Sequence, residues 1–507
     1  MTLPAPAELN LFNSLTRETA PFAPIDPSIV KIYSCGPTVY NFAHLGNLRA
    51  YVFTDTLRRV LNWKGYAVNH VINITDVGHL TSDADAGDDK MEAAAARASK
   101  SIWEIAAFYT EAFKTDLKRL NVREPTLWST ATDHIQDMIS FARIIEDKHC
   151  YSLDTGLYFD SESIENYGRL AGTRADETVA RIAEVEGKRH PSDFAIWRAS
   201  PPGEQRQMEW QSPWGPGAPG WHLECSVMSL KYLGPQFDIH TGGIDHREIH
   251  HVNEIAQNQA FTGTCKTGAN WWMHNNFLID RAGKMSKSSG GFATLQSLID
   301  RGVHPLAYRM LCLSAHYRSE LEFSTDNLSA ALTRLKRLVI AVSQLRDQAT
   351  ETGWLRVLNE AADSRGASAD WQRAAIEQDL SDNALSFIAR FDEAISADLM
   401  LPKALPLLEE AIAAKALTAD ERLRLIATMD LALGLDLIAL TRPALRLRPA
   451  EAAIDEATVE ARLADRRAAR AAKDFAASDA IRDELTAAGI ELMDGDPLGW
   501  DWKVRLS

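Results

Sequence analysis

The feature that most constrains the fold is a strand–turn–helix–strand pattern near the start of the chain. The apolar run at residues 30–35 predicts a buried strand, residues 48–63 have a helical pattern, and residues 67–74 predict a second strand. These elements favour a βαβ unit, which places both strands in one parallel sheet. We therefore expect an α/β protein built on a Rossmann-like parallel sheet.

The turn between this strand and this helix is a candidate anion site. It contains His44, Gly46 and Asn47, close to the predicted start of the helix. In α/β proteins this position places an anion on a helix N-terminus, and His44 and Asn47 can add hydrogen-bond donors. A histidine that only caps or packs the helix is the alternative.

A second phosphate-type element follows residue 280. Lys284 and Lys287 lie three apart in a loop that is flanked by Gly283 and Gly290. Glycines let a loop approach a ligand closely, and lysine is a compact charge that suits the phosphates of a leaving pyrophosphate. A solvated basic turn is the alternative, and the presence of the His44 turn makes it the weaker one.

Composition sets the broad class of protein. The chain has 507 residues, of which 46% are hydrophobic, which is enough for about two to four domains. Its net charge of −15 disfavours non-specific coating of nucleic acid, although a local basic face can still bind RNA. The five cysteines are scattered, which fits a reducing cytoplasm. Residues 1–13 lack a signal-peptide pattern and no apolar run reaches membrane-spanning length, so we expect a cytoplasmic protein without a membrane partner.

Changes in composition along the chain predict three domains. A catalytic domain is expected at residues 1–326, with an inserted connective subdomain at about 121–219 that ends in a stretch rich in Pro, Gly and Trp. Helical periodicity predicts a helical bundle at 327–450, and a break near 442–450 precedes a small module at 451–507.

Four residues that are far apart in sequence are candidate metal ligands: Cys35, Cys225, His250 and Glu254. A spacing of four places His250 and Glu254 on one face of a helix. Two thiolates, an imidazole and a carboxylate can form a zinc shell. Buried structural cysteines and an exposed helix pair are the alternatives, and spacing alone does not remove them.

The two phosphate-type elements together resemble the paired signatures of class I aminoacyl-tRNA synthetases. Residues 44–47 read His-Leu-Gly-Asn where that class usually has His-Ile-Gly-His, and Asn47 keeps hydrogen-bond donors without a charge. Segments 34–40, 72–76, 220–226 and 242–254 are similar to those of the cysteinyl-tRNA synthetase family, and the similarity runs from about residue 9 to the C-terminus. Val252 stands where the family often has a glutamate, while Glu254 is retained.

The resemblance assigns expected roles to these residues. It implies one zinc ion per chain, which takes the substrate thiol as a fifth ligand, and Mg²⁺ that accompanies ATP. The implied zinc ligands are Cys35, Cys225, His250 and Glu254. The implied catalytic residues are His44, Asn47, Lys284 and Lys287; the ATP-binding residues are His44, Asn47 and Lys287; the substrate-binding residues are Thr75, Trp221 and Asp245. From the residues alone, Thr75 can equally cap a helix, Trp221 can pack in a core and Asp245 can form a turn.

The implied activity is that of a monomeric cysteine–tRNA ligase whose partners are L-cysteine, ATP and tRNA(Cys). The C-terminal module is then expected to bind the anticodon. Trp500 or Trp502 is then a candidate to stack an unpaired anticodon base. The candidate phosphate contacts are Arg462, Arg466, Arg467, Arg470, Lys473 and Arg482. Solubilising arginines and core tryptophans are the alternative.

Two other functions remain open at this point. A mycothiol-pathway ligase joins cysteine to an amino sugar with the same catalytic fold, and an inactive paralogue would bind zinc and RNA only. The length of the chain and residues 468–485 favour the tRNA enzyme over the first, and His44 with both loop lysines argues against the second.

Overall fold

The computed structural model describes a large part of the chain. The described residues are 6–77, 91, 101–172, 186–201, 203, 206–280, 294–349, 380–493 and 495–504, together with the backbone of 283–284. Within these ranges, no helix combines the length and the apolar character that a membrane span requires.

Five parallel strands form the central sheet, in the order β11–β10–β3–β4–β5. The expected Rossmann-like parallel sheet is therefore confirmed. The strands are β3 (Ile29–Ser34), β4 (Ala67–Ile74), β5 (Leu127–Thr130), β10 (Phe237–Gly243) and β11 (Ala269–Asn275). The first two match the strands that the apolar runs predict, and they pair in register from Ile29 opposite Ala67.

The direction of the chain reverses between β3 and β10. From β3, helix α1 (Leu45–Trp63) leads to β4. Helix α3 (Ile102–Arg119) precedes β5, which lies next to β4 in the same half of the sheet. From β10, helices α6 (Ile244–Glu248) and α7 (His250–Thr262) lead the other way, to β11. At such a reversal a crevice opens outside the carboxyl ends of the two strands, and this is where open α/β sheets bind ligands.

A separate antiparallel sheet lies between β5 and β10 in sequence. It has the order β6–β7–β8–β9 and is accompanied by α4, while α5 returns the chain to β10. The elements are α4 (Ile135–His149), β6 (Cys150–Leu153), β7 (Gly156–Phe159), β8 (Phe194–Ala199), β9 (Gly217–Pro219) and α5 (Trp221–Leu233). The range expected for the connective subdomain begins at 121, but β5 within that range belongs to the central sheet. This short strand contains no long apolar run that would mark it in the sequence.

The chain beyond β11 is mostly helical. A small sheet of order β13–β12–β14 comes first, and a group of long helices follows. The elements are β12 (Leu278–Asp280), β13 (Gly283–Lys284), α8 (Leu295–Ile299), α9 (Pro305–Leu313), β14 (Leu321–Glu322), α10 (Thr325–Gln348), α13 (Asp382–Ser396), α14 (Leu401–Ala413) and α15 (Ala419–Leu433). One large cluster of buried side chains joins α10, α13, α14 and α15 to α1 and the sheet.

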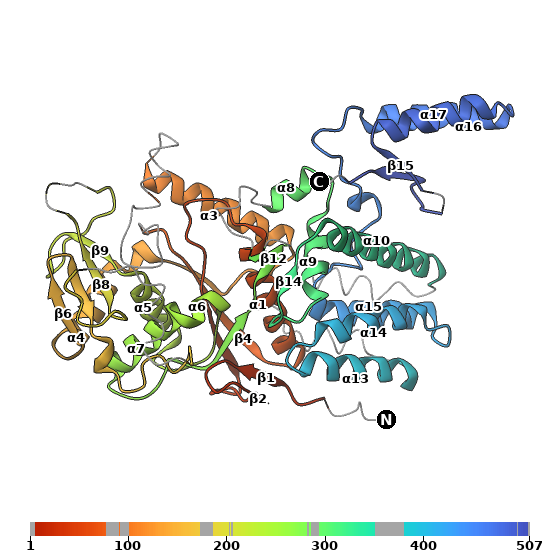
Figure 1. The fold of residues 1–507 in the computed structure, drawn as a ribbon. Coiled ribbons are helices and arrows are strands. Elements are labelled where there is room, and N and C mark those ends of the chain that lie inside the picture. The colour runs from red at the N-terminus through yellow and green to blue at the C-terminus, as the bar shows by residue number, and fades with distance from the viewer. Residues whose placement is uncertain are drawn as a thin grey trace.

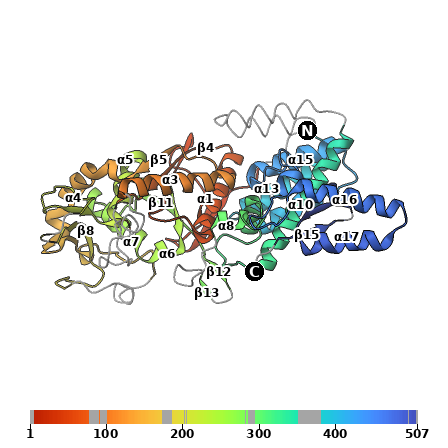
Figure 2. The same ribbon diagram turned by 90° about the horizontal axis from the view of Figure 1, so that it is seen from above.

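The last residues form a small unit with its own apolar cluster. It consists of α16 (Glu456–Ala471), α17 (Phe475–Ala487), β15 (Ile490–Leu492) and β16 (Trp500–Trp502). Figures 1 and 2 show this unit at one end of an elongated molecule and the antiparallel sheet at the other, with the central sheet between them. At the N-terminal side, β1 (Asn10–Asn13) and β2 (Glu18–Pro21) form a hairpin.

Candidate active site and metal centre

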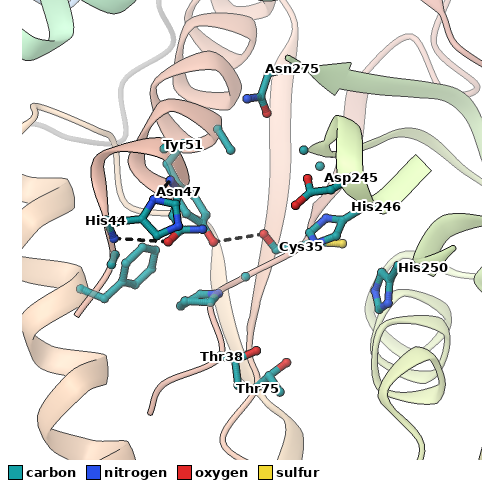
Figure 3. Close-up of a pocket in the computed structure, with 18 of the residues that line it drawn as sticks. Cys35, Thr38, His44, Asn47, Tyr51, Thr75, Asp245, His246, His250 and Asn275 are labelled. Atoms are coloured by element: carbon teal, nitrogen blue, oxygen red, sulfur yellow. Dashed lines mark hydrogen bonds between the residues drawn. The ribbon is translucent and has the colours of Figure 1, made fainter. Parts of the chain in front are cut away.

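A pocket of about 460 Å³ opens at the carboxyl ends of β3 and β10, where the chain direction reverses. The residues that line it come from the turn before α1, the end of β4, the start of α5 and the loop after β10 (Figure 3). Among them are Cys35, His44, Asn47, Thr75, Trp221, Cys225, Asp245 and His250. The structure thus brings eight of the expected site residues to one cavity.

His44 and Asn47 form the start of α1. His44 is the N-cap, and its Nδ1 accepts a hydrogen bond from the Asn47 backbone N at 3.2 Å. Asn47 Oδ1 in turn accepts from the His44 backbone N at 3.3 Å, which closes a capping box. Histidine as a helix cap was the structural alternative for His44, and here it coexists with a position on the pocket wall.

The four expected metal ligands converge beside this turn. Cys35 directly follows β3, Cys225 lies on α5, and His250 and Glu254 lie one turn apart on α7. One donor atom from each lies within 4.8 Å of the others. His250 Nε2 is 3.4 Å from Cys225 Sγ and 3.0 Å from Glu254 Oε1. Ligand atoms around a tetrahedral zinc ion are about 3.3–3.8 Å apart, so the spacing fits a metal ion.

The hydrogen bonding of Glu254 supports this fit. Its Oε2 contacts His240 Nε2 at 2.9 Å, which fixes the carboxylate from behind. Its Oε1 is buried and, among the residues that the structure describes, has no hydrogen-bond partner of suitable geometry. An oriented but unsatisfied carboxylate oxygen beside two thiols and an imidazole is the arrangement expected of a metal ligand.

A second set of donors shares two of these residues. His240 and His251 also lie within 4.8 Å of Cys35 and Glu254. His251 Nε2 is 3.2 Å from Cys35 Sγ, while its Nδ1 is 2.8 Å from His274 Nε2. No motif in the sequence indicates a role for His240, His251 or His274. Each comes from β10, α7 or β11 and is almost completely buried, so buried histidines near strand ends are the signal that could have found them.

The electrostatics of the cluster follow from burial and mutual contact. Burial raises the pKa of the Cys35 thiol well above its ordinary value. At Cys225 burial acts in the same direction, but a hydrogen bond with Cys35 and the nearby His250 outweigh it and lower the pKa to about 6. Burial also opposes charge at Glu254, yet His240 and His250 lower its pKa to about 2. Burial opposes charge at His250 as well, but Glu254 and Cys225 outweigh it and raise its pKa to about 10. Near neutral pH a thiolate and a carboxylate therefore share a proton held on His250, and a divalent cation bound by the three groups would replace that proton.

Thr75, Trp221 and Asp245 surround the cluster. The Thr75 hydroxyl donates to Glu224 Oε2 at 2.8 Å, and burial with the nearby Cys225 raises the pKa of Glu224 to about 8. The Trp221 ring lies 4.3 Å from the His250 ring, centroid to centroid, and is half-buried. Asp245 is exposed at the start of α6, on the pocket side (Figure 3).

Asn73 is a pocket residue that the sequence analysis missed. Its Oδ1 accepts from the Gly36 backbone N at 2.7 Å and lies 3.8 Å from Cys225 Sγ. A Cβ on Gly36 would lie 1.5 Å from the Asn73 carbonyl oxygen, so only glycine allows β3 to end this close to β4. An asparagine within the apolar second half of β4, at residues 71–74, was the available signal.

The loop lysines are only partly described. The backbone of Lys284 belongs to β13 and pairs with Ile279 of β12, next to Leu278 on the pocket wall. Lys287 lies outside the described residues.

The two C-terminal tryptophans are core residues. Trp500 and Trp502 are 0% and 2% exposed, and the Trp500 indole donates to Glu460 Oε1 at 2.6 Å. Their suggested role in stacking a base is therefore wrong, because neither ring is accessible. Arg462 pairs with Glu484, and Arg482 pairs with Asp479 and Asp483. Arg466 is half-buried, whereas Arg467, Arg470 and Lys473 are exposed.

The known proteins that this chain resembles are aminoacyl-tRNA synthetases, as the residues of the pocket lead us to expect. Residues 21–333 match a family model described as the catalytic domain of class I (C) tRNA synthetases. The chain is 65% identical to the cysteine–tRNA ligase of Zymomonas mobilis over 506 residues, which cover 98% of each chain. It is 56% identical to the cysteine–tRNA ligase of Novosphingobium aromaticivorans over 511 residues, or 99% of each chain.

A solved structure supports the fold at lower identity. Methionyl-tRNA synthetase of Mycobacterium tuberculosis, in complex with methionyl-adenylate, has a TM-score of 0.50 and 15% sequence identity, and the match covers 80% of this chain and 89% of that one. Fold, family model and near full-length relatives lead to one assignment. The chain belongs to the cysteine–tRNA ligase family of class I aminoacyl-tRNA synthetases.

Proposed function

We propose that this chain activates L-cysteine with ATP and transfers it to the 3′ end of tRNA(Cys). The observation that carries the proposal is a single pocket that joins the His44 turn, a phosphate-type element, to a cluster of two thiols, an imidazole and a carboxylate. Relatives named cysteine–tRNA ligase match almost the whole chain, including the C-terminal unit that an amino-sugar ligase does not need.

In the first step, the carboxylate of cysteine attacks the α-phosphate of ATP. The bond between the α-phosphorus and the bridging oxygen breaks, and pyrophosphate leaves with the electron pair. His44, Asn47 and the N-terminus of α1 hold the phosphates. Lys284 and Lys287 stabilise the charge on the departing pyrophosphate, and Mg²⁺ accompanies ATP. No protein nucleophile is needed, since positioning and charge stabilisation carry the step.

The amino acid lies between the His44 turn and the metal cluster. Asp245 is exposed at the pocket and accepts a hydrogen bond from the substrate ammonium or from a ribose hydroxyl. The Trp221 ring limits the width of the pocket beside His250. Thr75 contributes to the wall, and its bond to Glu224 fixes the orientation of its side chain.

One zinc ion held by Cys35, Cys225, His250 and Glu254 accounts for the choice of cysteine. These residues would hold the ion where it would bind the thiolate of cysteine, a bond that the hydroxyl of serine and the methyl group of alanine cannot replace. Such a site rejects these analogues at the binding step, without a separate editing site.

In the second step, a hydroxyl of the terminal ribose of tRNA attacks the carbonyl carbon of the adenylate, and AMP leaves. We assign residues 1–326 to catalysis, with an inserted subdomain after β5, residues 327–450 to a helical bundle, and residues 451–507 to the anticodon end of the tRNA. Helix α6, which borders the pocket, and helices α16 and α17 of the C-terminal unit lie at separate places along the elongated molecule (Figure 2), as the two ends of a tRNA require. The exposed Arg467, Arg470 and Lys473 are the candidate phosphate contacts.

The test is cysteine-dependent exchange of pyrophosphate with ATP, followed by charging of tRNA(Cys). The parent chain is expected to do both, and Lys287→Ala is expected to lose most of the exchange. Lys266→Ala removes an exposed lysine from the loop before β11 and serves as the matched control. Absence of cysteine-dependent exchange in the parent contradicts the proposed function, and near-normal exchange in Lys287→Ala contradicts the role of that lysine.

A further inference from the structure

Three aromatic rings form a cluster at the edge of the pocket, which we call the aromatic rim: Phe42, Phe108 and Tyr109. Phe42 lies two residues before His44, and the other two lie on α3. The Phe42 ring centroid is 5.9 Å from that of Phe108 and 5.0 Å from that of Tyr109. All three pairs meet edge to face, which is a favourable packing of rings. The rim is therefore a built cluster of aromatic side chains.

The rim faces solvent to an unusual degree. Phe42 is 44% exposed and Phe108 is 50% exposed, whereas Tyr109 is partly buried and packs on the main core. Phe42 and Tyr109 also line the pocket that contains His44 and Cys35. Exposed phenylalanines at the edge of a site mark a surface that a ligand or partner covers.

The charges around the rim restrict what covers it. Glu104 and Glu111 lie four residues before and three residues after Phe108 on α3, which places them on the same side of the helix. Glu111 pairs with Lys114 at 3.5 Å, and Glu104 accepts hydrogen bonds from Ser101, so neither side chain offers a positive charge to a phosphate backbone or to an anionic membrane surface. Flat, uncharged rings that stack on Phe42 and Phe108 fit the surface better, and unpaired nucleic-acid bases are such rings.

We propose that the aromatic rim stacks unpaired bases at the 3′ end of the tRNA as its terminal ribose enters the pocket. The inference rests on the proposed function, because only the transfer step brings a single-stranded RNA end to this cavity. The contact acts through base stacking rather than through phosphates. It therefore adds affinity for tRNA without requiring positively charged side chains at this position. It serves the second step and contributes nothing to the attack of cysteine on ATP.

The experiment compares Phe108→Ala with Trp103→Ala in the full-length chain. Trp103 is also an exposed aromatic residue of α3, at 47%, but it lies five residues from Phe108 and therefore about 140° around the helix. Charging of tRNA(Cys) and cysteine-dependent pyrophosphate exchange are measured for both variants. Binding is measured with intact tRNA(Cys) and with the same tRNA lacking its unpaired 3′ nucleotides. Phe42→Leu provides a second variant, because it keeps an apolar side chain and removes only the ring.

Loss of one stacked base is expected to raise the KM for tRNA roughly tenfold in Phe108→Ala, with exchange close to that of the parent. The Kd for the shortened tRNA is expected to be the same for parent and variant. Phe108→Trp is expected to restore charging, and Trp103→Ala to behave as the parent. Because no phosphate contact is lost, the dependence of the tRNA Kd on salt is also expected to stay the same.

Three results overturn the proposal. The first is an unchanged KM for tRNA in both Phe108→Ala and Phe42→Leu. The second is an equal loss of affinity for intact and shortened tRNA, and the third is a parallel loss of Tm, exchange and charging, which indicates simple packing. A parent chain without cysteine-dependent exchange contradicts the proposed function itself. A parent that exchanges and charges, with rim variants that match it, contradicts only the rim.

Discussion

Single residues decide which of two donor sets beside the pocket could hold a metal ion. Cys35 and Glu254 belong to two possible donor sets, one completed by Cys225 and His250 and the other by His240 and His251. Cys35 lines the pocket and is common to both sets, but of the residues that complete them only Cys225 and His250 also line the pocket. His240, which lies on β10, instead contacts Oε2 of Glu254. We therefore assign His250 as a ligand and His240 as the residue that orients Glu254.

This assignment predicts different effects for two histidine substitutions. His250→Ala removes a ligand, so zinc content after dialysis is expected to fall to a small fraction of one ion per chain. His240→Ala removes a contact behind a ligand, so the chain is expected to retain zinc with an affinity lowered about 10- to 100-fold. Metal analysis and competition with a chelator measure both effects. Retention of zinc by His250→Ala, together with its loss from His240→Ala, would assign the ion to the second set.

At the scale of elements, a buried ion cluster joins α1 to the helices that follow the sheet. Asp55 on α1 contacts Arg59 Nε and, across the interface, Arg309 Nη2 on α9, both at 2.6 Å. Arg309 Nε also donates to the carbonyl of Leu433 at the end of α15, at 2.8 Å. Burial opposes ionisation of Asp55, but Arg59 and Arg309 outweigh it and hold its pKa well below the usual range.

The sign of the pKa shift predicts how Asp55 affects stability. Because the folded-state pKa is lowered, its stabilisation is present above the unfolded value of about 3.9 and is lost as the pH falls further. Asp55→Asn leaves two arginines without their buried partner, so it is expected to destabilise the chain by about 3–5 kcal/mol near neutral pH. The difference in the free energy of unfolding between the parent and Asp55→Asn is expected to narrow below about pH 4. Urea denaturation at several pH values measures this difference.

Asp116 on α3 is the matched control for this prediction. Burial raises its pKa, with partial compensation by Arg119, so its charged form is disfavoured in the folded chain. Asp116→Asn is expected to be neutral or slightly stabilising near neutral pH. Equal destabilisation by the two substitutions at every pH would contradict the ionic account of Asp55.

The sequence predicts elements well where hydrophobicity alone determines them. β4 has the bounds that its apolar run indicates, and α1 begins only three residues before the predicted start because His44 and Asn47 cap it. The four ligands could be proposed only through the family resemblance, since their convergence depends on the parallel pairing of β3 with β10. The contacts of His240 and His251 with Cys35 and Glu254 arise from the same pairing, so no local pattern indicated them. Trp500 and Trp502 were misread because residue type alone does not reveal burial.

At the scale of the whole molecule, one arginine attaches the C-terminal unit to the helical bundle. Arg442, after α15, is buried and donates from Nε to Asp496 Oδ2 at 2.8 Å and from Nη2 to Asp501. Lys336 on α10 also pairs with Asp501, which lies on β16. These contacts hold the unit of α16 and α17 in place at the end of the molecule.

The attachment predicts an effect on charging but not on activation. Arg442→Met leaves two buried carboxylates without their main partner, so the C-terminal unit is expected to loosen and the chain to be cleaved faster by protease near residue 450. The kcat/KM for tRNA charging is expected to fall about tenfold or more, while pyrophosphate exchange changes little. Arg448→Met, at an exposed position in the same connection, is the control. Equal loss of exchange and charging in Arg442→Met would show that the unit does not serve tRNA separately.

We propose that the pocket selects cysteine through a metal ion next to the ATP site. The most direct measurement is the ratio of kcat/KM for cysteine to that for serine in pyrophosphate exchange, before and after zinc removal and after zinc is restored. We expect a ratio of roughly 10⁴ or more with zinc, a loss of most of that ratio without it, and recovery when zinc is added again. An unchanged ratio in fully zinc-free chain would show that a metal ion does not select cysteine.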